Sequence, residues 1–264
     1  MKFALVSLNQ HWENKDLNKK RINKIVEKLS NYKLDWVIFP EITLTGFSMN
    51  CDKIADKNNE TLLWFKELAK NIKINIIFGA AVLEKDMYKN KAYAVSADGE
   101  VLCEYSKIHL FSIAKENIFY KAGEQVACFN YKNTNIGLTI CYDLRFPELY
   151  QTLSKQCYII INIANWPAVR KDHWFTLLKA RSIENQSFFI GVNRIGIDGN
   201  NLSYEKSSII YSPNGELLKP DFKSREFDIF EIELSIVDKI RSSFPVQNDR
   251  KGELYAKWYK DFRK

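Results

Sequence analysis

The chain is poor in the residues that support metal-binding and disulfide-bonded folds. Its only histidines, His11, His109 and His173, lie far apart, and its five cysteines are odd in number and widely scattered. No two cysteines have the spacing of zinc ligands, so we expect neither a metal site nor a disulfide framework. We also expect no organic cofactor, because the sequence lacks a phosphate-binding Gly-rich loop.

Long hydrophobic runs are missing as well. No apolar segment approaches the roughly 18 residues that a membrane span needs. Residues 1–7, MKFALVS, look like a first strand, and this stretch is too short for a signal peptide and is followed by no small-residue cleavage site. We therefore expect a cytoplasmic protein whose cysteines stay reduced.

The net charge of +7 is compatible with a nucleic-acid-binding protein. The lysines are spread along the whole chain, however, and it contains no Arg-rich run with interleaved aromatic residues. We therefore interpret the charge as a composition bias and expect no nucleic-acid partner. The alternative predicts salt-sensitive binding to DNA.

A chain of 264 residues that is 46% hydrophobic can bury the large core of one domain. Alternating apolar residues predict strands at 2–8, 36–39, 74–83, 92–97, 101–105, 126–130, 135–140, 158–163, 187–193, 207–211 and 227–234. Apolar residues near helical spacing predict helices at 16–29, 60–70 and 172–185. This mixture of hairpins and strand–helix alternation predicts an α/β fold with two sheets between helix layers.

Local signals refine this prediction. Asp16 is placed to cap the first helix, and Ser235 to cap a helix after the last strand. Asp98 and Gly99 form a strong hairpin-turn signal. No linker or repeat divides the chain, so we predict one domain over residues 1–247 and a C-terminal extension over 248–264, to which we assign no element.

Cys141 is the most informative residue of the chain. It follows an alternating strand-like run that ends at Ile140, and Pro147 then opens a predicted helix. The C-terminal edge of a strand is where ligands gather in α/β folds. A cysteine on a strand is also commonly a small buried hydrophobe, so its position alone leaves both roles open.

Two more polar residues stand just beyond strand-like runs, namely Glu41 after WVIFP and Lys107 after VLCEYS. Taken singly, each could be a solvated loop residue. Together with Cys141 they supply what acyl transfer needs. These groups are a thiol nucleophile, a carboxylate that can take its proton, and an ammonium that stabilises the oxyanion.

The segments around these residues resemble the nitrilase superfamily of carbon–nitrogen hydrolases. They read FPEITLTG at 39–46, YSKIHLF at 105–111 and CYDLRFPE at 141–148. The resemblance covers roughly residues 2–245. Within the superfamily, the sequence is similar to the bacterial ω-amidase branch in NWP at 165–167, HW at 173–174 and ARSIENQ at 180–186. It implies a single-domain, four-layer α-β-β-α sandwich. It also implies pairing through a sheet-extending, helix-lined interface into a homodimer or a larger assembly.

The resemblance also implies catalytic roles. Glu41 would be the general base, Lys107 the oxyanion stabiliser, and Cys141 the nucleophile that carries a thioester intermediate. A second catalytic glutamate would be Glu116, which stands seven residues before a glycine. The sequence around that glycine reads AGE where the family commonly has Pro-Gly-Asp, which weakens the assignment of Glu116 alone.

ω-Amidases hydrolyse the terminal amide of 2-oxoglutaramate and 2-oxosuccinamate, and we expect the same reaction here. Because such a substrate carries a carboxylate, its pocket should offer a cation. Arg145 is our candidate, since an arginine fork matches a carboxylate well. The alternative is that Arg145 pairs locally with Asp143 or Glu148.

Further residues are expected near the substrate. The backbone N–H of Tyr142 would bind the oxyanion, while Phe111 and Trp166 are candidates for pocket walls or for plain packing residues. His109 could line the pocket or be structural.

Two other functions are compatible with these residues. Another amidase of the superfamily would share the triad and act on deaminated glutathione, an N-carbamoyl compound or a simple aliphatic amide. A catalytically silent binding protein on this fold is the second alternative. The intact Glu41, Lys107 and Cys141 argue against it, because a scaffold would tolerate the loss of any one of them.

Overall fold

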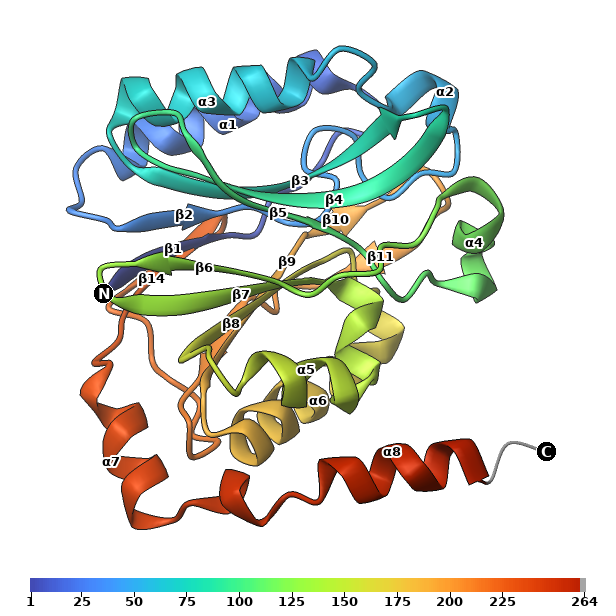
Figure 1. Ribbon diagram of the computed structural model, residues 1–264. Helices are drawn as coiled ribbons and strands as arrows, with labels where there is room; N and C mark the ends of the chain where they lie inside the picture. The colour runs from blue at the N-terminus through green and yellow to red at the C-terminus, as the bar shows by residue number, and fades with distance from the viewer. Residues whose placement is uncertain (262–264) are drawn as a thin grey trace.

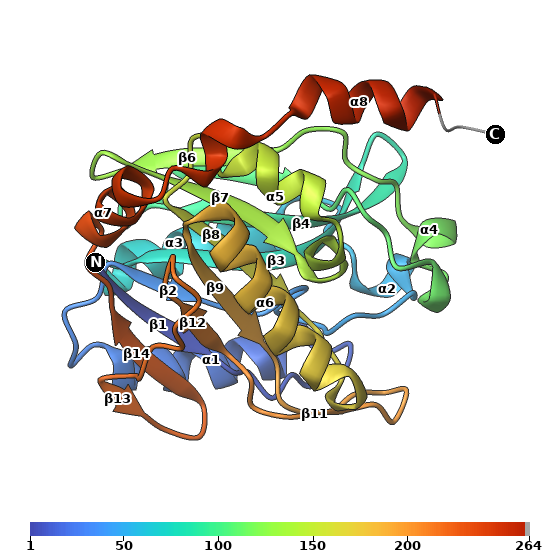
Figure 2. The same cartoon turned by 90° about the horizontal axis from the view of Figure 1, so that it is seen from below.

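The computed structural model describes residues 1–261 and contains two β-sheets that face each other (Figure 1). One sheet has seven strands in the order β13-β14-β1-β2-β3-β4-β5, and the other has five in the order β12-β9-β8-β7-β6. Helices α1 and α3 cover the outer face of the first sheet, and α5 and α6 cover that of the second (Figure 2). The predicted four-layer α-β-β-α sandwich is therefore confirmed.

The strands of the first sheet are β1 (Lys2–Val6), β2 (Trp36–Ile38), β3 (Asn75–Glu84), β4 (Met87–Val95), β5 (Val101–Ser106), β13 (Phe222–Lys223) and β14 (Phe227–Glu231). The second sheet contains β6 (Ala127–Tyr131), β7 (Thr134–Ile140), β8 (Ile159–Ala164), β9 (Phe188–Asn193) and β12 (Ile209–Tyr211). A separate ribbon pairs β10 (Gly196–Ile197) with β11 (Ser203–Tyr204).

The covering helices are α1 (Lys15–Leu29), α3 (Glu60–Ile72), α5 (Pro147–Leu153) and α6 (Lys171–Asn185). Short helices lie in connecting segments, namely α2 (Cys51–Ile54), η1 (Ser112–Ala114), α4 (Glu116–Phe119), η2 (Cys141–Arg145) and η3 (Ala168–Arg170). The C-terminal part contains α7 (Ser235–Ser243), η4 (Val246–Asp249) and α8 (Gly252–Asp261). No helix within residues 1–261 is both long and apolar enough to cross a membrane.

The alternation of side chains along β2 shows how the sequence builds the layers. Trp36 and Ile38 point into the core between the sheets, whereas Val37 packs under α1 and α3. Under these helices, the ring of Phe65 stacks on that of Phe78 at 3.9 Å. Each fully buried large apolar side chain stabilises the fold by about 1.5–3 kcal/mol.

The connections between parallel strands bring polar loops to one edge of the sandwich. Strands β1, β2 and β3 run parallel in the first sheet, as do β7, β8 and β9 in the second. The segments after β2 and β8 meet there, because the backbone N–H of Asn165 donates to Glu41 at 2.9 Å. This edge holds the site described below.

The structure corrects three local predictions. Asn14, not Asp16, caps α1, since its side chain accepts from the N–H of Leu17 at 3.0 Å. Ser235 is the first residue of α7, and Leu234 takes the cap position. The strand predicted at 92–97 begins earlier, as β4 at Met87. Lys85 and Asp86 form the tight turn before it, and both have positive φ although neither is the glycine that such turns favour.

The hairpin turn at Asp98 and Gly99 is confirmed, with Gly99 at a φ of 78°. Residues 248–261, to which the sequence assigned no element, include the exposed helix α8. The domain boundary at residue 247 stays a prediction.

The capping assignment can be tested by paired substitutions. Asn14→Ala removes a side-chain acceptor from the first turn of α1 and should lower the free energy of unfolding by about 1 kcal/mol. Asp16→Ala removes only a favourable charge near the helix N-terminus and should cost about 0.3 kcal/mol. Urea unfolding monitored by circular dichroism measures both values. A larger loss for Asp16→Ala would restore Asp16 as the cap.

Candidate active site

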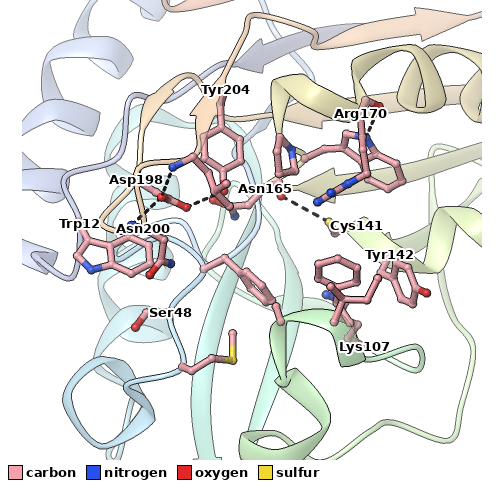
Figure 3. Close-up of a pocket in the computed structure, with 18 of the residues that line it drawn as sticks. Trp12, Ser48, Lys107, Cys141, Tyr142, Asn165, Arg170, Asp198, Asn200 and Tyr204 are labelled. Carbon is pink, nitrogen blue, oxygen red and sulfur yellow. Dashed lines mark hydrogen bonds between the residues drawn. The ribbon is translucent and has the colours of Figure 1, made fainter.

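A pocket of about 660 Å³ opens at this edge (Figure 3). Six of the residues that the sequence predicted for the site line it, namely Lys107, Phe111, Cys141, Tyr142, Arg145 and Trp166. Glu41 and Glu116 lie behind Lys107, fully buried. The structure thus brings together all eight predicted site residues, from segments up to 125 positions apart in the chain (41 to 166).

A buried charge cluster forms the floor of the site. The Lys107 ammonium lies 3.0 Å from Glu41 Oε1 and 2.9 Å from Glu116 Oε2, and all three side chains are at most 1% exposed. Asn90, which the sequence did not single out, joins the two acids by donating to Glu41 at 2.8 Å and to Glu116 at 3.0 Å. Glu116 is therefore no exposed loop acid but a member of this network.

Burial and charge act in opposite directions on these groups. Burial alone would lower the pKa of Lys107, but the negative charges of Glu116 and Glu41 outweigh it and raise that pKa. Burial also raises the pKa of Glu116, against the opposing effect of Lys107 and with a further increase from Glu41. Lys107 is therefore charged, and Glu116 holds a proton more readily than an exposed glutamate does.

A tight turn presents Glu41 to this cluster. Ile42 has a φ of 41°, which is strained for a β-branched residue. The side-chain amide of Gln10 donates to the carbonyls of Glu41, Ile42 and Thr43 at 3.0–3.1 Å. A Cβ on Gly79 of the neighbouring β3 would lie 2.6 Å from the Ile42 nitrogen, so only glycine allows this close approach.

Asn165 completes the environment of Glu41. Its backbone N–H donates to Glu41 Oε2 at 2.9 Å, and its side-chain amide donates to the Glu41 carbonyl at 2.7 Å. Its own carbonyl lies 3.8 Å from the sulfur of Cys141, which donates to it. Asn165 was noticed in the sequence only as part of a motif, and nothing there showed that it joins Glu41 to Cys141.

Cys141 stands on a strained turn between β7 and η2. Its φ of 46° is rare for a residue with a side chain and costs on the order of 1–3 kcal/mol. Burial and the nearby charge of Glu41 raise its pKa well above the usual range, although Lys107 opposes the shift. The thiol therefore carries its proton at neutral pH and needs a base in order to react.

Asp143 stabilises this turn. One of its oxygens accepts from the backbone N–H of Ile140 at 3.0 Å and from the hydroxyl of Tyr105 at 2.8 Å. The other accepts from the backbone N–H of His109 at 3.0 Å and lies 2.8 Å from the His109 ring. The ring of His109 also stacks on Phe146, so its role is structural.

Arg145 does not pair with either acid near it in sequence. Asp143 is occupied as just described, and Glu148 accepts from the hydroxyl of Tyr259 at 2.8 Å. The Arg145 guanidinium instead lies over the ring of Trp166, 5.0 Å from its centre, and its Nη2 lies 3.2 Å from Nδ1 of His173. The local-pairing alternative is therefore wrong, and Arg145 faces the pocket.

Comparisons with known proteins identify the family of the chain. The carbon-nitrogen hydrolase family model matches residues 2–242. The chain is 34% identical to the "Hydrolase in agr operon" of Staphylococcus aureus over 97% of this chain and 100% of that protein. It is 32% identical to the 2-oxoglutaramate amidase of Bacillus subtilis, over 90% and 93% respectively.

A solved structure is also similar. XC1258 from Xanthomonas campestris, a CN-hydrolase superfamily protein with an arsenic adduct in the active site, matches with a TM-score of 0.88 and 28% identity. The match covers 95% of this chain and 97% of that one. The chain belongs to the carbon–nitrogen hydrolase family of the nitrilase superfamily and is a hydrolase that acts on amides.

The role of Asp143 gives a stability test. Asp143→Ala leaves the buried N–H of Ile140, the buried hydroxyl of Tyr105 and the partly buried N–H of His109 without this acceptor, and should lower the free energy of unfolding by about 3 kcal/mol. Tyr105→Phe removes one of these hydrogen bonds and the longer one, 3.3 Å, that its hydroxyl accepts from the Ile108 N–H, and should cost about 1 kcal/mol. Denaturant unfolding compares the two, and equal losses would show that Asp143 does not hold the turn.

Proposed function

We propose that this hydrolase is an ω-amidase, which cleaves the terminal amide of small ω-amido keto acids such as 2-oxoglutaramate and 2-oxosuccinamate. The products would be a dicarboxylic keto acid and ammonia. The observation that carries the proposal is the buried cluster of Glu41, Lys107 and Glu116 beside Cys141 on a pocket lined with cations. The 2-oxoglutaramate amidase among its relatives supports the choice of substrate.

The first half of the reaction would form a thioester. Glu41 takes the proton of the Cys141 thiol while the sulfur attacks the amide carbonyl carbon. The resulting oxyanion is stabilised by the Lys107 ammonium and the Tyr142 backbone N–H. Glu41 then gives the proton to the amide nitrogen, the C–N bond breaks, and ammonia leaves.

The second half would return the enzyme to its starting state. A water molecule gives a proton to Glu41 and attacks the thioester carbonyl, which forms the new carboxylic acid. The C–S bond breaks, and the Cys141 sulfur recovers the proton from Glu41. Glu116 does not touch the reacting atoms in this scheme. It positions Lys107 and keeps it charged, since Glu116 raises the Lys107 pKa.

Assembly and location are further parts of the proposal. We propose that the protein works in the cytoplasm as a homodimer or a larger homo-oligomer. Residues 248–264 would form an extension beyond the catalytic domain. Light scattering of the purified protein tests the assembly.

The nucleophile can be tested directly. Cys141→Ala removes the attacking atom and should abolish ammonia release from 2-oxoglutaramate, while the circular dichroism spectrum stays unchanged. Cys128→Ala is the matched control, because Cys128 is exposed and lies outside the pocket lining, and it should keep full activity. Substantial amidase activity in Cys141→Ala would refute the mechanism.

Carboxylate recognition by Arg145 is a separate prediction. Arg145→Ala should raise KM for 2-oxoglutaramate by about tenfold or more, because a charge-assisted hydrogen bond is lost. A neutral short amide should be affected far less. Steady-state kinetics on both substrates measures the difference, and equal effects would remove Arg145 from carboxylate binding.

A further inference from the structure

The charges that line the pocket do not cancel one another. Its cations are Lys107, Arg145 and Arg170, and its acids are Glu13 and Asp198. Lys107 is already engaged by the two buried glutamates behind it. Glu13 and Asp198 are then the only acids of the described pocket lining that could pair with Arg145 and Arg170.

Both acids are satisfied elsewhere. Glu13 forms an ion pair with Lys53 at 2.9 Å and accepts from the hydroxyl of Ser48 at 2.6 Å. Asp198 accepts from the hydroxyl of Tyr204 and from the backbone N–H of Asn200, each at 2.8 Å. Neither carboxylate contacts an arginine of the pocket.

In the described part of the chain, Arg145 and Arg170 therefore have no acidic partner. Within residues 1–261, no carboxylate oxygen lies within 4.0 Å of either guanidinium. Arg170 lies over the ring of Phe111, 5.5 Å from its centre, much as Arg145 lies over Trp166. Apart from the contact of one Arg145 N–H with the His173 ring, packing against an aromatic face leaves the N–H groups at the edge of each guanidinium free to bind an anion.

The backbone of Arg170 is held firmly. Its carbonyl accepts from the indole N–H of Trp166 at 2.7 Å, and its N–H donates to the carbonyl of Pro167 at 3.0 Å. Trp166 thus anchors Arg170 through its N–H and supports Arg145 with its ring face. Figure 3 shows Arg170 on the same side of the view as Cys141, with Trp12 and Asp198 on the other side.

We infer that Arg170 binds the acid end of the substrate together with Arg145, and that the two form one anion subsite of the pocket. This inference rests on the proposed amidase function. Two guanidinium edges suit a group with more than one acceptor, and a 2-oxo acid offers two carboxylate oxygens and an adjacent oxo oxygen. The substrate class is therefore an amide with a 2-oxo carboxylate at its other end.

Three amides of similar length separate the contribution of the substrate carboxylate from that of its oxo group. 2-Oxoglutaramate has the carboxylate and the oxo group, glutaric acid monoamide has the carboxylate alone, and pentanamide has neither. We expect Arg170→Gln to raise KM about tenfold or more for the first, less for the second, and hardly at all for pentanamide. The kcat for 2-oxoglutaramate should change less than about twofold, because a residue that binds substrate and transition state equally affects KM.

Lys171→Gln is the matched control. Lys171 is the next residue, loses the same charge, pairs with Glu205 at 2.5 Å and does not line the pocket. It should leave all three KM values unchanged. An equal loss on pentanamide in Arg170→Gln, or an unchanged KM for 2-oxoglutaramate, would overturn the inference.

Binding of the dianion 2-oxoglutarate, measured by calorimetry, separates this inference from the proposed function. Wild-type protein that hydrolyses none of the amides would contradict the ω-amidase proposal. If it still bound 2-oxoglutarate, and Arg170→Gln weakened that binding about tenfold, the anion subsite would stand. Equal affinity in wild type and Arg170→Gln would remove Arg170 from the subsite.

Discussion

The bridge that Lys107 makes between Glu41 and Glu116 is the contact on which the site depends. A buried ammonium is tolerated only beside negative charge, and two buried carboxylates this close would repel each other without it. The three residues come from the segment after β2, the segment after β5 and the start of α4. The charge cluster therefore fixes how three otherwise separate loops lie relative to one another.

The same cluster explains why the thiol is held as a thiol. Burial raises the pKa of the Cys141 thiol, and the negative charges of Glu41 and Glu116 raise it further against the opposing effect of Lys107. A permanent thiolate would be open to oxidation and alkylation between turnovers. In the proposed mechanism the sulfur becomes nucleophilic only when Glu41 takes its proton during attack on the amide carbon.

The sequence was informative about groups that stand at strand ends and uninformative about their partners. Cys141, Glu41 and Lys107 follow recognisable apolar runs, so their neighbourhood in the fold could be anticipated. Asn90 could not, because it lies in the polar segment MYKNK at residues 87–91, in which no periodicity marks a strand. Its contact with Glu41 also spans 49 residues, and it depends on a β3–β4 turn that contains no glycine. Arg170 was overlooked because nothing in the sequence distinguishes it from a solvated loop arginine. Only the structure shows that it lines the pocket.

The proposed function divides the pocket into a reactive end and a recognition end, which differ in how their charges are compensated. At the reactive end every charge has a buried partner at close range, so its geometry is preorganised and does not need the substrate. At the recognition end Arg145 and Arg170 pack on aromatic rings and have no carboxylate partner among residues 1–261, so in the proposal an anionic substrate provides the counter-charge. A neutral amide in the pocket would displace water from the two guanidinium groups without forming an ion pair with them. This uncompensated desolvation would weaken its binding. In the proposed amidase, selectivity for an acid would follow from the two arginines without an acidic partner, and the chemistry from the paired charges of Glu41, Lys107 and Glu116.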